Sequence, residues 1–122
     1  MQDINDTIYF DKDADIRLIQ SKKVAIIGYG NQGSAQALNL KDSGVDVRIG
    51  LRKNSKSLRI ATKDGFQCDM IESVVKWGDV ICCLIPDQYM ADTYIKNIDP
   101  YLSSNKTLLF SHGYNIHYQL IY

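Results

Sequence analysis

The segment AIIGYGNQGSAQALNLKDSG, residues 25–44, places Gly28, Gly30 and Gly33 at G-x-G-x-x-G spacing directly after a short apolar run. An apolar strand that leads through such glycines into a helix is typical of a dinucleotide-binding turn. Gly28 would permit the tight turn, Gly30 would let a pyrophosphate approach the backbone, and Gly33 would let the helix pack against the strand. The positive end of that helix would face the phosphates. A glycine turn that holds no ligand is the alternative.

Segments of strand and helix character alternate along the rest of the chain. Apolar and β-branched runs predict strands, and apolar residues that recur three or four positions apart predict helices. Strands are predicted at residues 23–28, 45–50, 66–69, 79–85 and 107–110. Helices are predicted at residues 31–43, which Gly44 would end, at residues 58–63, around Ile71, Val74 and Val75, and along a stripe of Met90, Ala91, Tyr94, Ile95 and Ile98.

This alternation predicts the fold class. Strands joined through helices form βαβ units with right-handed crossovers and a parallel sheet. We therefore expect an α/β fold of Rossmann type, a doubly wound, mainly parallel sheet of about five strands in the order 3-2-1-4-5 with helices on both faces. Such sheets bind ligands where the strand order reverses, which would bring together the loops at residues 29–33, 52–57, 86–90 and 111–117. Residues 1–20 would form an N-terminal arm and residues 21–122 the domain.

Composition narrows the class of protein. The 122 residues suffice for one domain with a core but are few for a complete two-substrate enzyme. Lysine and arginine together number 14, as do aspartate and glutamate, so the net charge of zero favours neither a nucleic acid nor a membrane as partner. The acidic start lacks a secretory signal, and no apolar run approaches the ~20 residues of a membrane span. We expect a soluble globular protein.

The three cysteines, Cys68, Cys82 and Cys83, lie within apolar runs. Adjacent residues on a strand point to opposite faces, so Cys82 and Cys83 do not suit a disulfide framework. We interpret all three as core residues of a protein in a reducing compartment. That compartment would be the cytoplasm or, in a eukaryote, an organelle stroma or matrix, although no transit peptide is seen.

The loop after the second predicted strand bears on the choice of nucleotide. An acidic side chain at this position, about 20 residues beyond the glycines, would bind the ribose hydroxyls of NAD. The segment GLRKNSKS, residues 50–57, has no acid and instead holds three cations and two serines. Arg52 can bind a phosphate through two hydrogen bonds, and Ser55 and Ser57 can donate to its remaining oxygens. The pattern favours the 2′-phosphate of NADP over a merely solvated basic loop.

A histidine follows the fifth predicted strand, whose carboxyl end adjoins the expected nicotinamide position. In SHGYNIH, residues 111–117, Gly113 allows a sharp turn. His112 could transfer a proton, orient a polar substrate or hold a water. From position alone, a functional and an incidental His112 are equally well supported, and His117 is interpreted as incidental.

Three segments together carry a resemblance to a known family: YFDKDADIRLIQSKKVAIIGYGNQGSAQALNLKDSGVDVRIGLRKNSKS, PDQYMADTY and SHGYNIHYQ. From about Ile8 to its last residue, the chain resembles the N-terminal domain of the ketol-acid reductoisomerases, also called acetohydroxyacid isomeroreductases. The resemblance implies an NADPH- and Mg²⁺-dependent enzyme of valine and isoleucine biosynthesis. Such an enzyme isomerises 2-acetolactate or 2-aceto-2-hydroxybutyrate by alkyl migration and reduces the product to a 2,3-dihydroxy acid.

The resemblance also implies roles for particular residues. It places Tyr29, Gly30, Asn31 and Gln32 on the cofactor diphosphate, and Arg52, Ser55 and Ser57 on the 2′-phosphate. It places the loop of Asp87, Gln88, Tyr89 and Met90 against the cofactor, and His112 at the active site. Among the departures, Asn54 replaces a frequent glycine, which asparagine can do because it accepts positive φ. Met90 replaces a usual glutamine and so lacks its polar contact.

Length is the larger departure from the family. The acidic residues that hold two Mg²⁺ ions, and most of the substrate pocket, would lie in a helical C-terminal domain outside these residues. Asp11, Asp13, Asp87 and Asp92 lack the pairing of a two-metal site, so no metal ligand is expected here. We expect the cofactor-binding part of an enzyme that is active only when joined to a C-terminal domain. A C-terminal domain supplied in trans and a homo-oligomer are the candidate protein partners. A stand-alone NADP-binding module and an inactive remnant of a truncated gene are the alternatives.

Overall fold

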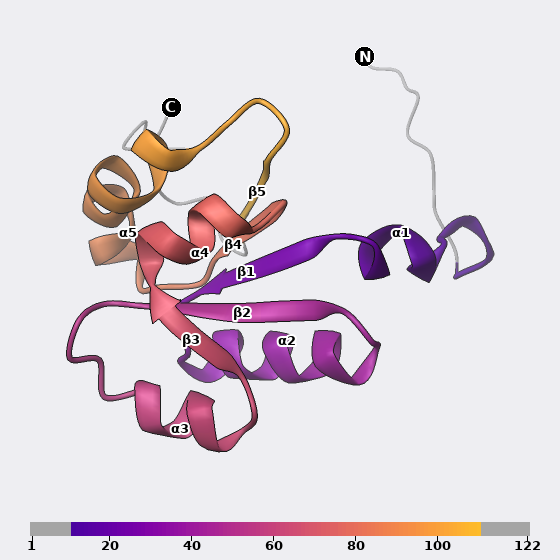
Figure 1. The fold of residues 1–122 in the computed structure, drawn as a ribbon, viewed down its shortest axis with the longest axis horizontal. Coiled ribbons are helices and arrows are strands. Elements are labelled where there is room, and N and C mark those ends of the chain that lie inside the picture. The colour runs from indigo at the N-terminus through magenta and orange to yellow at the C-terminus, as the bar shows by residue number, and fades with distance from the viewer. Residues whose placement is uncertain (1–10, 111–122) are drawn as a thin grey trace, which may run out of the picture.

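One parallel sheet lies between two layers of helices in the computed structural model, which describes residues 11–110 (Figure 1). The strands in this part of the chain are β1 (Lys23–Ile27), β2 (Asp46–Leu51), β3 (Gln67–Met70), β4 (Val80–Cys83) and β5 (Thr107–Phe110). All their pairings are parallel, and they are arranged in the order β3-β2-β1-β4-β5. The predicted fold class and strand order are confirmed.

The helices cover both faces of this sheet, with α2 and α3 on one side and α4 and α5 on the other (Figure 1). The described helices are α1 (Ile16–Gln20), α2 (Asn31–Asp42), α3 (Leu58–Lys63), α4 (Ile71–Trp77) and α5 (Asp87–Thr93), with the π-helical η2 (Tyr94–Ile98) and the 3₁₀ turns η1 (Asp11–Asp13) and η3 (Asp99–Tyr101). The short α1, which the sequence pattern did not reveal, begins where the Asp15 carboxylate accepts from the backbone N–H of Arg17. Across residues 11–110, no helix has the length and apolar character needed to cross a membrane.

The core has two halves, one on each face of the sheet. Val24 and Ile26 of β1 pack with α2 and the residues around α3, whereas Ala25 and Ile27 pack with α4 and α5. This alternation follows from the two-residue period of a strand that is buried on both faces. Because every second side chain of β1 enters each half of the core, the carboxyl end of β1 is held firmly between them.

The cysteines follow the same alternation. Cys82 is buried in the half that contains Val24 and Cys83 in the half that contains Ala25, so the prediction that they face opposite ways is confirmed. Cys68 is half-buried and packs against the Cys82 half from β3. All three thiols are free of disulfides.

The two buried thiols predict a loss of stability in mild alkali. Burial raises the pKa of Cys82 to about 11, and burial together with the neighbouring Cys82 charge raises that of Cys83 to about 12. A thiol in the unfolded chain titrates near pH 8.5, so each group stabilises the fold fully below that pH and less as the pH rises towards its folded value. The free energy of unfolding should therefore fall from about pH 8.5 upwards, by at most about 1.4 kcal/mol per thiol and pH unit.

Urea unfolding under reducing conditions between pH 7 and pH 10.5 measures this slope. The double variant Cys82→Ala, Cys83→Ala should be less stable at pH 7, because it leaves cavities in the core, but its stability should depend less on pH. Equal slopes for the two proteins above pH 8.5 would show that these thiols are not the cause.

The predicted apolar stripe from Met90 to Ile98 is only partly correct. Met90 and Ile98 of the predicted stripe are buried, but Ile95 is 61% exposed. Ile95 lies in η2, where the hydrogen bonds run from residue i to i+5 and the turn is wider than in an α-helix. The wider turn rotates Ile95 away from the core, which a stripe drawn with the α-helical period could not anticipate.

Candidate cofactor site

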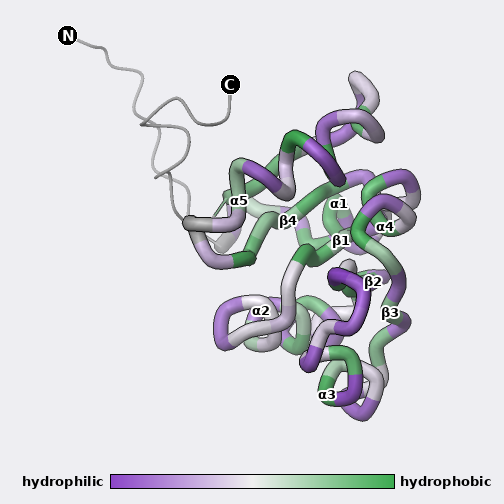
Figure 2. Tube along the Cα trace, turned by 90° about the vertical axis from the view of Figure 1, so that its left-hand side faces the viewer, coloured by the Kyte–Doolittle hydropathy of each residue, from purple (hydrophilic) through white to green (hydrophobic). Residues whose placement is uncertain are grey.

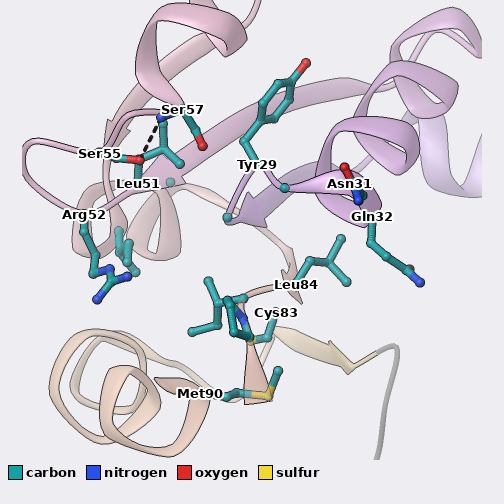
Figure 3. A pocket seen from close by; sticks show the side chains of 16 residues that line it. Tyr29, Asn31, Gln32, Leu51, Arg52, Ser55, Ser57, Cys83, Leu84 and Met90 are labelled. Carbon is teal, nitrogen blue, oxygen red and sulfur yellow. Dashed lines mark hydrogen bonds between the residues drawn. The ribbon is translucent and has the colours of Figure 1, made fainter. Parts of the chain in front are cut away.

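A cavity of about 580 Å³ opens at the carboxyl ends of β1, β2 and β4 (Figure 3). It lies where the strand order reverses, between β1 and β4, which is the position at which doubly wound sheets bind ligands. The glycine loop after β1, the loop after β2 and the segment from β4 into α5 line it. The described lining residues are Gly28, Tyr29, Gly30, Asn31, Gln32, Gly50, Leu51, Arg52, Ser55, Ser57, Ile71, Cys83, Leu84, Ile85, Pro86 and Met90.

The three glycines of the first loop differ in backbone conformation and in the space around them. Gly28 has a φ of +99°, which favours glycine, and its N–H donates to the carbonyl of Gly50 at 3.0 Å. A Cβ on Gly33 would lie 2.6 Å from the carbonyl oxygen of Gly28, so only glycine lets α2 pack this close to the turn. A Cβ on Gly30 would meet nothing within 4 Å, because this residue borders the open cavity.

The first turn of α2 points its backbone donors towards the same space. Gly30 is the N-cap residue of α2 and makes no side-chain capping hydrogen bond. The side chain of Gln32 instead accepts from Nε2 of Gln36 along the helix at 3.1 Å. The N–H groups at the start of α2 and its positive dipole end are therefore available to an anion in the cavity.

The loop after β2 is folded back on itself by hydrogen bonds. The N–H of Ser55 donates to the carbonyl of Arg52 at 3.0 Å, and Asn54 between them has a φ of +65°, so the expectation that asparagine adopts positive φ here is confirmed. The hydroxyl oxygen of Ser55 accepts from the N–H of Ser57 at 3.2 Å, which leaves its proton free to donate. Ser57 is the N-cap residue of α3, yet its hydroxyl makes no capping hydrogen bond.

Of the three cations in this loop, Arg52 is the one that borders the large cavity. Its guanidinium carbon lies 5.2 Å from the ring centroid of Tyr89, which is 45% exposed. Lys53 lines a smaller hollow beside β3 instead, and Lys56 lines neither space. Among the lining residues that the structure describes, Arg52 is the single charged side chain. Figure 2, which faces this end of the sheet, shows the hydrophilic segment between β2 and α3 beside the apolar strands.

Tyr29 borders the cavity through its backbone, because its side chain is turned away (Figure 3). The residue is 5% exposed, and its ring meets that of Phe66 edge to face at a centroid distance of 5.8 Å. Its hydroxyl donates to Oδ2 of Asp64 at 2.5 Å. Burial, assisted by the hydrogen bond and charge of Asp64, raises the pKa of Tyr29, so the phenol stays protonated as a donor. Its side chain is thus unavailable to the diphosphate that the resemblance assigned to this residue.

The third segment differs from the predicted loop at residues 86–90. Pro86 is the N-cap residue and α5 begins at Asp87, so the prediction of a loop was wrong. β4 already ends at Cys83, and Pro86, whose fixed φ suits the residue before a helix and which has no N–H to satisfy, serves as the N-cap of α5. Met90, 3% exposed, presents apolar surface to the cavity. The side chains of Asp87 and Gln88 lie outside what the structure describes, and so does residue 112, the predicted active-site histidine.

The apolar wall of the cavity was not predicted. Ile71 of α4 and the chain from Cys83 to Ile85 supply it, opposite the loop that holds Arg52. In the sequence, these apolar residues cannot be distinguished from other core residues. Their position just after predicted strands was the one indication that they could line the cavity. Within residues 11–110, no three histidine, cysteine or acidic side chains gather as they would around a metal ion.

The fold and this site define a class, the dinucleotide-binding Rossmann domains, since a doubly wound sheet carries the glycine turn and an anion-binding loop at its switch point. Comparison with known proteins identifies the family. The family described as acetohydroxy acid isomeroreductase, NADPH-binding domain, matches residues 18–122, and the chain belongs to it.

Named relatives agree with this membership. The chain is 50% identical over 115 residues to ketol-acid reductoisomerase (NADP(+)) 2 of Bifidobacterium longum, covering 94% of the chain and 33% of that protein. It is also 50% identical over 114 residues to the ketol-acid reductoisomerase (NADP(+)) of Methanocaldococcus jannaschii, covering 93% and 34%. The chain thus spans about a third of the length of these relatives.

A solved structure shares the fold closely. It is an NADH-preferring ketol-acid reductoisomerase from an uncultured archean, which superposes with a TM-score of 0.88 at 39% identity over 92% of this chain and 35% of that one. Because one member of the family prefers NADH, membership alone does not decide the nucleotide. The nucleotide preference of this chain therefore depends on the residues that line its own cavity.

Proposed function

We propose that this chain is the NADPH-binding part of a ketol-acid reductoisomerase. The observation that carries the proposal is one cavity bordered both by a glycine turn with free helix donors and by Arg52, Ser55 and Ser57. An arginine and two serine hydroxyls are suited to a phosphate monoester, and no described acid faces the cavity to favour an unphosphorylated ribose.

The residues of the site divide by the part of the cofactor that they would hold. The backbone around Gly30, including Tyr29, Asn31 and Gln32, would bind the diphosphate, while Gly28 and Gly33 shape the turn. Arg52, Ser55 and Ser57 would bind the 2′-phosphate. Tyr89 would support Arg52 from the start of α5, whose residues Asp87, Gln88 and Met90 would flank the cofactor.

NADPH, when bound, supplies the hydride for the reduction. The role of this chain would be to hold the cofactor against the apolar wall of the cavity and to exclude water from the cofactor. His112 would act at the active site as a proton carrier or substrate-orienting group. Its position supports this, because it comes two residues after β5 ends at Phe110, which pairs with the cavity-lining Cys83.

The substrate and metal would be bound largely by residues beyond this chain. We propose 2-acetolactate or 2-aceto-2-hydroxybutyrate as substrate, with Mg²⁺ held by a C-terminal domain that is joined to this chain or supplied in trans. A homo-oligomer is a further proposed assembly. Residues 1–20 are proposed as an arm and residues 21–122 as the NADPH-binding domain, since the sheet begins at Lys23. The free thiols support the cytoplasm or an organelle interior as the location.

A chimaera tests the proposed activity. This chain would replace the matching third of the Bifidobacterium longum relative, and NADPH oxidation would be followed with 2-acetolactate and Mg²⁺. Turnover is expected, and His112→Ala should lower it by about 100-fold or more while NADPH binding persists. A chimaera that folds and binds NADPH but shows no turnover would contradict the enzymatic proposal, and it would leave a stand-alone binding module as the better description.

A further inference from the structure

One hydrogen bond connects the two phosphate-binding loops of the site. We propose that the bond from Tyr29 to Asp64 is a positioning link that sets the 2′-phosphate loop relative to the glycine loop and thereby sustains selectivity for NADPH over NADH. The inference rests on the proposed function, whose failure the experiment below detects separately.

The geometry of α3 makes this link direct. Tyr29 stands between Gly28 and Gly30 in the glycine loop, and its hydroxyl donates to the Asp64 carboxylate at 2.5 Å. Asp64 is the C-cap residue of α3, and Ser57 is the N-cap residue of the same six-residue helix. A force on one end of so short a helix moves the other, so fixing Asp64 also fixes Ser57 and the loop before it.

A second contact ties the same point to α2. The Lys41 ammonium donates to the carbonyls of Asp64 and Gly65 at 3.0 and 3.3 Å and lies 5.0 Å from the centroid of the Phe66 ring. The Tyr29 ring also packs against Phe66, with the ring centroids 5.8 Å apart. The end of α3 is thus held both by the loop that precedes α2 and by the last turn of α2.

The chemistry of the link makes it a strong hydrogen bond. Tyr29 is buried and Asp64 is half-buried, so a phenol deprived of Asp64 would lose a well-placed acceptor at the edge of the core. The bond is also strengthened by the charge of the carboxylate that accepts it. The Tyr29 side chain is turned away from the cavity, so it can influence the cofactor through the loops and not by contact.

The two cofactors should respond differently when the link is lost. The diphosphate donors belong to the glycine loop and α2, which keep their own hydrogen bonds and packing. The 2′-phosphate group needs Arg52, Ser55 and Ser57 at the correct distance from that diphosphate site. Loss of the link would therefore weaken the binding of NADPH, which contacts both loops, more than the binding of NADH, which lacks the 2′-phosphate.

Fluorescence titration of the purified chain with NADPH and NADH tests the inference. Tyr29→Phe keeps the ring against Phe66 and removes only the hydroxyl. It should weaken NADPH binding by about fivefold or more and NADH binding by less than about twofold. Asp64→Ala should do the same, the double variant should be no worse than either single variant, and Asp64→Asn, which can still accept the bond, should keep most of the selectivity.

A matched control is available elsewhere in the fold. The Tyr94 hydroxyl also donates to an aspartate, Asp99, at 3.4 Å, far along the chain from both loops. Tyr94→Phe should leave the NADPH to NADH affinity ratio unchanged. An equal loss of both cofactors in Tyr29→Phe, an unchanged ratio, or additive effects in the double variant would overturn the inference while the proposed function stands. A wild-type chain that binds neither cofactor would overturn both.

Discussion

Replacement of Arg52 by Asp, together with Ser55→Ala and Ser57→Ala, is expected to reverse the nucleotide preference of this chain from NADPH to NADH. Arg52 is the single charged side chain among the described lining residues, and both serines line the same part of the cavity. The variant removes the donors that suit a phosphate and adds an acid, which would repel the 2′-phosphate and accept from ribose hydroxyls.

The expected loss of NADPH affinity is about 1,000-fold. A hydrogen bond to a charged group contributes about 1.5–3 kcal/mol, so loss of the arginine contacts and added repulsion together give about 4 kcal/mol. NADH affinity should stay within about threefold or improve, because NADH has no phosphate at this position. Fluorescence titration with each cofactor measures both affinities.

Lys56→Gln is the matched control for this experiment. It removes one positive charge from the same loop at a residue that lines neither cavity. NADPH affinity should change by less than about threefold, since an exposed charge at a distance is screened by solvent and salt. If Lys56→Gln weakened NADPH as strongly as the Arg52 variant, the loop would act through its overall charge and not through the contacts assigned to Arg52.

Two glycine substitutions in the first loop should separate folding from binding. Gly33→Ala should destabilise the chain by about 2–4 kcal/mol, because its Cβ would lie 2.6 Å from the Gly28 carbonyl oxygen and the backbone must shift. Gly30→Ala should change stability by less than about 1 kcal/mol, since its φ of −83° suits alanine and its Cβ meets open space.

Of these two variants, Gly30→Ala, which changes stability less, should have the larger direct effect on NADPH binding. The Gly30→Ala methyl would stand where the diphosphate approaches the backbone, so NADPH affinity should fall by about tenfold or more. Urea unfolding gives the free energy of unfolding of each variant, and titration gives its affinity for NADPH. If Gly30→Ala bound NADPH normally, the diphosphate would not lie against this turn.

Patterns that depend on local sequence allowed most of the fold to be predicted. The strand that ends at the glycine turn, the helix at residues 58–63 and the fifth strand were found because period, punctuation and turn residues agree there. The positive φ of Asn54 agrees with the family resemblance, in which a glycine is frequent at this position and asparagine can replace it. The start of α5 was missed, since Pro86 was interpreted as the end of a strand, whereas β4 ends at Cys83 and the proline is the N-cap of the helix.

The parts of the site that depend on tertiary contacts could not be predicted from the sequence. Tyr29 and Asp64 are 35 residues apart, and nothing in their local sequence pairs a phenol with that carboxylate. Of three neighbouring cations, Arg52 is the one that lines the large cavity, and this likewise depends on how the loop folds at the end of β2. The exposure of Ile95 arises from a π-helical turn, which the apolar stripe does not encode.

Calorimetric titration of the wild-type chain with NADPH and with NADH tests the central claim most directly. The cavity that joins the glycine turn to Arg52, Ser55 and Ser57 predicts that NADPH binds at least about tenfold more tightly, since the 2′-phosphate adds charged hydrogen bonds that NADH cannot make. Adenosine 2′,5′-bisphosphate should compete with NADPH, and adenosine 5′-monophosphate should not. Equal affinities for the two cofactors, or tighter binding of NADH, would contradict the assignment of this loop to the 2′-phosphate.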